Sequence, residues 1–237
     1  MWGIRQQPKR SKVACPAQEA AGWPTPISNH LTRQGLLRHP EGGRCADRRT
    51  RHEKEAIVDF ARVLDTVTRF LDERGFRYAL VGAFALSSYG LSRATRDIDF
   101  AVDARAQGDL IVFLESLGYE TIYRSEGYSN HVRGLPEQGR VDCIYVGEPT
   151  ATKLFEGARV VPLFGKTIPV PRPEHLAAMK ILAMKNDPTR TFQEMADIQH
   201  ILGLPGVDVK EVQGYFAHYG LPEKFDELRR ILDSDRS

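Results

Sequence analysis

Residues 78–103 constrain the fold of this chain more than any other stretch. The stretch begins with a short apolar run that Gly82 interrupts, and about two helical turns follow before Gly90 ends them. Residues 97–102 then alternate in polarity with a period of two, which is the period of a β-strand. The sequence therefore predicts a strand, a glycine turn, a short helix and a second strand.

The second of these strands carries two carboxylates on one face. Side chains two residues apart on a strand point the same way, so Asp97 and Asp99 share a face and Ile98 points to the other. Neighbouring carboxylates repel each other, and a cation between them relieves that repulsion. Mg²⁺ suits such a site, because it binds one or two carboxylates and fills its octahedron with waters and phosphate oxygens. A solvated acid pair on a surface strand is the alternative.

Two further features favour a metal and phosphate site. Gly82 precedes a helix, and the backbone N–H groups at a helix N-terminus bind phosphate, which glycine allows to approach closely. Asp142 lies within the apolar run of residues 140–146, where an ionised carboxylate is costly unless it is paired or metal-bound. An edge strand whose acid faces water is the alternative for Asp142. The glycine turn and the acid pair Asp97 and Asp99, within one strand-helix-strand unit, together indicate chemistry on a nucleoside triphosphate.

This arrangement resembles the signature of the DNA polymerase beta-type nucleotidyltransferase superfamily. The resemblance rests on the pattern Gly82-Ala83, Gly90-x-x-Arg93-x-Thr95-x-Asp97-Ile98-Asp99-Phe100. Within the superfamily, the chain is most similar to the AbiEii/MenT-like toxin nucleotidyltransferases over roughly residues 55–205. That family usually has Gly-Gly or Gly-Ser at the turn, so Ala83 is a departure that keeps the backbone amide. The resemblance implies an α/β (α+β) fold, with a polymerase beta-like core, a mixed sheet and a C-terminal helical subdomain.

The resemblance also implies a reaction and its metal ligands. Asp97, Asp99 and Asp142 would be catalytic residues that bind two Mg²⁺ ions, with Asp142 on the side of the acceptor. The implied reaction moves a nucleoside monophosphate from a nucleoside triphosphate to an acceptor hydroxyl and releases pyrophosphate.

Lys180 lies within the apolar stripe of a helix predicted over residues 174–185. Such a lysine either extends along the surface to solvent or reaches a buried anion. By resemblance it matches the lysine of the family's corresponding helix, which implies a catalytic, nucleotide-binding residue. Lys180 would hold the triphosphate together with Arg93 and the backbone amides of Gly82 and Ala83.

The next helix departs from the family pattern. Relatives carry Arg, then Lys-Asp, then Asp, whereas this chain has Arg190, then Gln193 and Glu194, then Asp197. Glu194 is either a further carboxylate of the site or, with Thr191, a capping box that starts the helix. We favour the capping box.

Composition and periodicity divide the chain into three parts. Residues 1–52 form a predicted disordered basic extension, residues 53–172 the nucleotidyltransferase core and residues 173–237 a helical subdomain. We expect a helix from about Glu53, with Ile57 on its apolar stripe, that ends near Gly75. Further elements are expected at residues 107–117, 151–156, 192–202, 208–218 and 222–232 for helices, and at 119–123, 131–135, 140–146, 159–163 and 166–170 for strands, with a turn at 125–130.

Charge and cysteine content limit the binding partners and the cellular compartment that we expect. Residues 1–55 hold 11 Lys/Arg against 5 Asp/Glu, while the remainder has a net charge of −4, so the body offers no general surface for nucleic acid. A basic arm that touches RNA is the alternative to a disordered extension. Cys15, Cys45 and Cys143 form no zinc or disulfide pattern, and Cys143 is expected in the core. This cysteine usage suits a reducing compartment, so we expect a cytoplasmic protein, and no apolar run is long enough to span a membrane.

The acceptor and the preferred nucleotide are not encoded in these motifs. The toxin-like resemblance implies RNA or tRNA as acceptor and an antitoxin protein as partner. A small-molecule (antibiotic) acceptor is a second reading. A catalytically decayed protein that only binds nucleotides or a partner is a third, motivated by Ala83 and the altered residues around Glu194.

Overall fold

The computed structural model describes residues 59–134 and 139–234. The expected extension over residues 1–52, with Cys15 and Cys45, and the expected helix start at Glu53 and Ile57 lie outside the described residues. Within the described chain, the first helix is α1 (Phe60–Glu73), whose expected stripe packs into the core and whose cap is Asp59.

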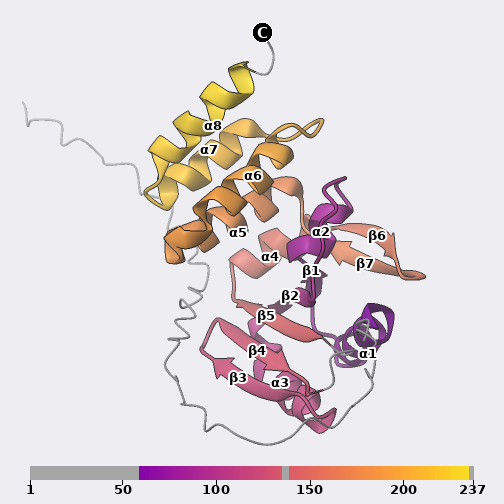
Figure 1. The fold of residues 1–237 in the computed structure, drawn as a ribbon. Coiled ribbons are helices and arrows are strands. Elements are labelled where there is room, and N and C mark those ends of the chain that lie inside the picture. The colour runs from indigo at the N-terminus through magenta and orange to yellow at the C-terminus, as the bar shows by residue number, and fades with distance from the viewer. Residues whose placement is uncertain (1–58, 135–138, 235–237) are drawn as a thin grey trace, which may run out of the picture.

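The sheet at the centre of the molecule has five strands in the order β1-β2-β5-β4-β3 (Figure 1). β2 and β5 run parallel, and the other neighbours are antiparallel. The mixed sheet predicted from the sequence is therefore confirmed. The strands are β1 (Tyr78–Leu80), β2 (Asp97–Asp103), β3 (Glu120–Arg124), β4 (Tyr128–Val132) and β5 (Arg140–Val146).

The position predicted for β4 is wrong. The strand begins at Tyr128, inside the expected turn, and ends at Val132 rather than at residue 135. Its polar residues mimic a loop in the sequence, but they form hydrogen bonds within β4 and with the neighbouring strands. The buried His131 ring lies 2.7 Å from the Ser129 hydroxyl and 3.1 Å from that of Thr121, so His131 is a hydrogen-bonded core residue.

Short helices and a hairpin surround the sheet. α2 follows β1 directly. The turn after α2 ends at Gly90, which has a φ of +90°. The rings of Phe70 and Phe113 stack at 4.0 Å and join α1 to α3. These elements are α2 (Gly82–Ser87), α3 (Gln107–Ser116), α4 (Thr150–Glu156), β6 (Arg159–Leu163) and β7 (Lys166–Val170).

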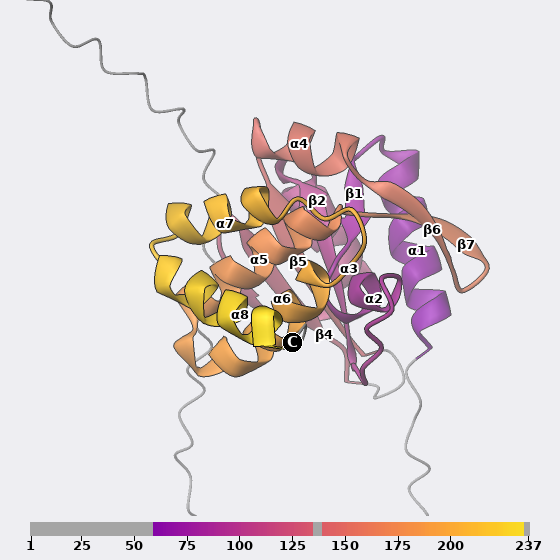
Figure 2. The same cartoon turned by 90° about the horizontal axis from the view of Figure 1, so that it is seen from above.

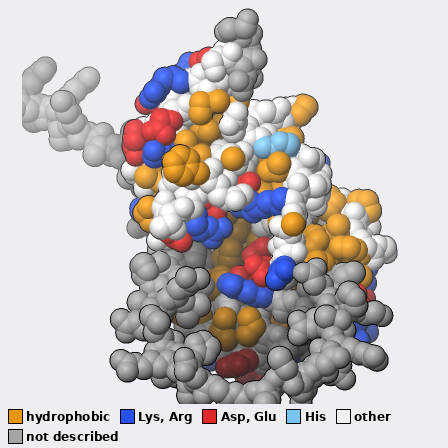
Figure 3. Space-filling model, viewed as in Figure 1, with side chains coloured by type: hydrophobic (Ala, Val, Ile, Leu, Met, Phe, Trp, Pro, Cys, Tyr) orange, Lys and Arg blue, Asp and Glu red, His pale blue; other side chains and the backbone are white. Residues whose placement is uncertain are grey.

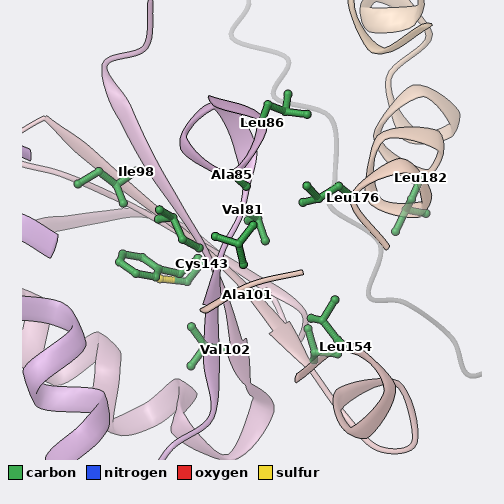
Figure 4. Close-up of a cluster of buried hydrophobic side chains, with 14 of the residues drawn as sticks. Val81, Ala85, Leu86, Ile98, Ala101, Val102, Cys143, Leu154, Leu176 and Leu182 are labelled. Carbon is green, nitrogen blue, oxygen red and sulfur yellow. The ribbon is translucent and has the colours of Figure 1, made fainter. Parts of the chain in front are cut away.

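From Pro173 onwards the described chain is helical, as predicted. The helices stack beside one another against one side of the sheet region (Figures 1 and 2). Leu176 extends toward Val81 and Ala85 beside the glycine turn (Figure 4). The helices are α5 (Pro173–Asn186), α6 (Thr191–Leu202), α7 (Val209–His218) and α8 (Pro222–Ser234), with a 3₁₀ turn at Pro188–Arg190.

The core runs through the sheet and into the helices, and Cys143 is buried in it as expected. Among the described residues, none of the helices has the length and apolar character needed to cross a membrane.

Candidate active site

A cleft of about 820 Å³ separates the sheet from α5 and the start of α6. Figure 3 shows acidic side chains inside a hollow, with basic side chains beside them. All seven residues that the sequence singled out line this cleft: Gly82, Ala83, Arg93, Asp97, Asp99, Asp142 and Lys180. Residues from widely separated parts of the chain are thus brought to one place.

The three predicted acids lie on two adjacent parallel strands. Asp99 of β2 stands opposite Asp142 of β5, and Asp97 lies two residues before Asp99 on the same face. β5 is an interior strand and Asp142 is 7% exposed, so the reading of Asp142 as an edge-strand acid facing water is wrong. The strand register places these carboxylates together.

Electrostatic strain is concentrated on Asp99. Burial, followed by the negative charge of Asp142, raises the pKa of Asp99 to about 7, although Lys180 acts in the opposite direction. Burial also raises the pKa of Asp142, against the influence of Arg140. Carboxylates that resist ionisation in this way would bind a cation favourably, because the cation supplies the missing opposite charge.

Sequence reasoning missed the polar residues around Asp142. Arg140 Nε donates to Asp142 Oδ1 at 2.8 Å, and the amide of Asn130 donates to the same oxygen. The hydroxyl of Tyr128 accepts from Asn130 at 3.3 Å and from Arg140 at 3.4 Å. Asn130 and Tyr128 lay in the predicted turn, so no signal marked them, whereas Arg140 was already two residues from Asp142 on one strand.

The glycine turn fits tightly against the acids. Gly82 adopts a φ of +63°, and a Cβ atom there would lie 2.0 Å from Asp99 Oδ2. The backbone N–H of Val81 donates to the carbonyl of Asp99 at 2.9 Å, which fixes the turn to β2. Position 82 therefore requires glycine both for its backbone and for the space that Asp99 occupies.

Lys180 reaches buried anions, the second of the two readings that the sequence allowed. Its ammonium lies 2.9 Å from Glu194 Oε2 and 2.8 Å from Asp197 Oδ2, and both acids are nearly inaccessible to solvent. Asp197 also forms an ion pair with Arg93, whose Nη1 lies 3.1 Å from Asp197 Oδ2. Since Arg93 precedes β2 while Asp197 lies on α6, this network joins the two walls of the cleft.

The capping box predicted for Glu194 is wrong. Arg190, not Thr191, is the N-cap of α6, and the Thr191 hydroxyl donates to the Pro188 carbonyl at 2.7 Å. The 3₁₀ turn before α6 shifts the helix start by one residue. Glu194 is instead fully buried between Lys180 and Arg190.

The acids suit a magnesium ion that completes its coordination shell with water or phosphate oxygens. Among the described residues, no three His, Cys, Asp or Glu side chains are arranged to hold a metal ion by themselves. Mg²⁺ typically takes one or two carboxylates and completes its shell with substrate phosphates and water. The neighbouring acids of β2 and β5, open to the cleft, suit that mode of binding.

A solved structure with a TM-score above 0.5 classifies this architecture. ANT(2'')-Ia, in a crystal structure with adenylyl-2''-tobramycin, matches with a TM-score of 0.52 and 13% identity over 67% of this chain and 95% of that chain. The fold is that of the nucleotidyltransferases. The polymerase beta-like fold expected from the sequence is thereby confirmed.

Two further solved structures match with lower TM-scores. The lincosamide antibiotic adenylyltransferase LnuA, lincomycin-bound, matches with a TM-score of 0.45 and 15% identity over 62% of this chain and 98% of that chain. An antigenic nucleotidyltransferase-like protein from Paracoccidioides brasiliensis matches with a TM-score of 0.45 and 17% identity over 72% of this chain and 94% of that chain. No protein-family model and no curated protein sequence matches this chain.

Proposed function

We propose that this protein is a metal-dependent nucleotidyltransferase that moves a nucleoside monophosphate from a nucleoside triphosphate to an acceptor hydroxyl. The observation that supports this most strongly is the register of β2 and β5, which places Asp99 opposite Asp142 in a cleft whose other wall carries Lys180. The nucleotidyltransferase fold agrees with this assignment.

In this proposal the carboxylates of Asp97, Asp99 and Asp142 hold two Mg²⁺ ions. When bound, such ions lower the pKa of an acceptor hydroxyl and neutralise charge on the departing pyrophosphate. The raised pKa of Asp99, caused by burial and by Asp142, supports a site that is incomplete without a cation.

The triphosphate would lie between the glycine turn and the two basic residues, Lys180 and Arg93, that pair with Asp197. The amides of Gly82 and Ala83 border the cleft, and Lys180 and Arg93 converge on Asp197 across from them. Their own carboxylate partners keep these cations in the cleft before a nucleotide arrives. Backbone amides and fixed cations together suit a polyphosphate.

For the acceptor we favour RNA or tRNA, in a cytoplasmic toxin of the AbiEii/MenT type that is paired with an antitoxin protein. This choice rests on the sequence resemblance in residues 82–100. A small-molecule acceptor is the second candidate, because one similar structure holds adenylyl-2''-tobramycin. A decayed site is disfavoured by the presence of Asp97, Asp99, Asp142 and Lys180 in one cleft.

The proposal is tested by supplying each of the four nucleoside triphosphates, labelled at the α-phosphate, with Mg²⁺ and either total RNA, an aminoglycoside or a lincosamide. We expect the wild type to label RNA and the Asp97→Ala variant to label nothing. Asp226→Ala, which removes an exposed acid on α8, is the matched control and should behave as wild type. Labelling of an antibiotic alone would favour the second acceptor class, and equal labelling by Asp97→Ala would refute the site.

A further inference from the structure

Strand β4 carries an amide at a position where an interior strand normally carries an apolar residue. Asn130 is 0% exposed and stands directly opposite Asp142 in the antiparallel pairing of β4 and β5. Asparagine is disfavoured in strands, and a buried amide is tolerated only with hydrogen-bond partners. The presence of asparagine here therefore needs a specific explanation.

The orientation of the Asn130 amide is set by Asp142. Its Nδ2 donates to Asp142 Oδ1 and, at 3.3 Å, to the hydroxyl of Tyr128. Its Oδ1 is buried and has no hydrogen-bond partner within the described chain. Turning the amide over would place Oδ1 against an oxygen of Asp142, two acceptors in contact. The side chain thus leaves one of its own atoms unsatisfied while it donates to the acid.

Arg140 holds the same carboxylate oxygen from β5. Its Nε donates to Asp142 Oδ1 at 2.8 Å, and its Nη2 lies 3.4 Å from the Tyr128 hydroxyl. Asp142 is therefore restrained by two donors that come from two strands, with Tyr128 linking the donors. Asp97 and Asp99 have no such pair of side-chain donors among the described hydrogen bonds.

We propose that Asn130 and Arg140 are positioning residues that fix the carboxylate of Asp142 for the cation on the acceptor side. The inference rests on the proposed function, since it concerns the same site. Asn130 does not line the cleft, so it acts only through Asp142. Residues that orient metal ligands typically change metal affinity or activity 10- to 100-fold when they are replaced.

The test replaces Asn130 by valine, an apolar residue that suits a strand and removes the donor. Mn²⁺ binding is measured by electron paramagnetic resonance on the nucleotide-free protein, beside turnover kinetics. We expect the dissociation constant for Mn²⁺ to rise about tenfold. kcat should fall by a similar factor, while KM for the nucleoside triphosphate stays within about twofold of wild type, because Lys180 and the glycine turn are untouched.

Ser129→Ala is the matched control. Ser129 is the preceding residue on β4, equally buried, and its hydroxyl contacts His131 and Tyr145 on the other face of the sheet. It should alter stability without changing Mn²⁺ affinity. Tyr128→Phe is a second variant, which removes the hydroxyl that contacts both donors and Asp142 itself. It should weaken Mn²⁺ binding in the same direction by a smaller factor than Asn130→Val does.

Failure of this inference is distinguishable from failure of the proposed function, because Mn²⁺ binding is measured without turnover. If Asn130→Val and Asp142→Asn bind Mn²⁺ more weakly than the wild type, the positioning role is supported. If the wild type at the same time never transfers a nucleotide, the transferase activity is refuted. Wild-type Mn²⁺ affinity and kcat in a folded Asn130→Val protein that still transfers nucleotide would overturn the positioning role alone.

Discussion

Gly82 and Asp99 occupy adjoining space so tightly that a Cβ atom on Gly82 would lie 2.0 Å from Asp99 Oδ2. The residue before Gly82 also donates its backbone N–H to the Asp99 carbonyl. The glycine turn and the acidic strand are therefore one structural unit. A change in the turn must move the acid, so the proposed phosphate site and the proposed cation site would be coupled through this contact.

The variant Gly82→Ala should lose both stability and transfer activity. The added methyl group collides with Asp99, and a φ of +63° disfavours any side chain. Gly90→Ala is the matched control, because Gly90 has a φ of +90° but open space around its Cβ position. Urea denaturation should show a loss of about 1–2 kcal/mol for Gly90→Ala and a larger loss for Gly82→Ala. Only Gly82→Ala should abolish transfer, and equal activity of both variants would contradict the coupling.

Asp99 should make the stability of the metal-free protein fall as the pH rises. Its folded-state pKa is raised to about 7, so the folded protein keeps a proton that the unfolded chain releases above about pH 4. The stabilisation is complete below pH 4 and is lost as the pH rises to 7. Relative to Asp99→Asn, the wild type should lose about 1 kcal/mol per pH unit across this window.

The measurement is urea unfolding of both proteins between pH 4 and 8 in the presence of a chelator. Adding Mg²⁺ with a nucleoside triphosphate should reduce the difference, because the cation compensates the ionised carboxylate. Parallel pH profiles of the wild type and Asp99→Asn would show that Asp99 has an ordinary pKa.

Lys180→Met should be strongly destabilising. The change leaves the buried carboxylates of Glu194 and Asp197 with fewer opposite charges, and breaking such a buried pair typically costs about 3–5 kcal/mol. The exposed Lys185 on the same helix supplies the control: Lys185→Met loses only a cation–π contact with Tyr219, so it should stay within about 1 kcal/mol of wild type.

The double variant Lys180→Met/Glu194→Gln separates the structural role of Lys180 from its role toward nucleotide. Neutralising Glu194 should recover part of the unfolding free energy, because one buried charge is removed together with its partner. Nucleotide affinity, measured by titration, should not recover. Recovery of both quantities would show that Lys180 serves only to balance charge.

The acidic strand and its glycine turn were predictable because their pattern is local. Strand period two places Asp97 and Asp99 on one face, and the break at Gly82 follows from its position between two regular segments. The contact of Gly82 with Asp99 was not predictable, because it depends on how β1 pairs with β2.

The errors arose where polar residues find partners distant in the chain. The polar sequence of β4 resembles a loop, yet Asn130 faces Asp142 across the sheet. Glu194 matches a capping box by spacing, yet it pairs with Lys180 on another helix as well as with Arg190 just before α6. Local patterns do not encode such pairings, which exist only once the strands and helices have packed.

The central claim is transfer of the nucleotidyl group, and the most direct measurement follows the label of a nucleoside triphosphate marked at either the α- or the γ-phosphate. With Mg²⁺ and the acceptor pool, the account predicts that the α-label enters the acceptor and the γ-label leaves in pyrophosphate. Both should require Asp97 and Asp142. Entry of the γ-label into the acceptor, or undiminished α-label transfer by Asp97→Ala, would contradict it.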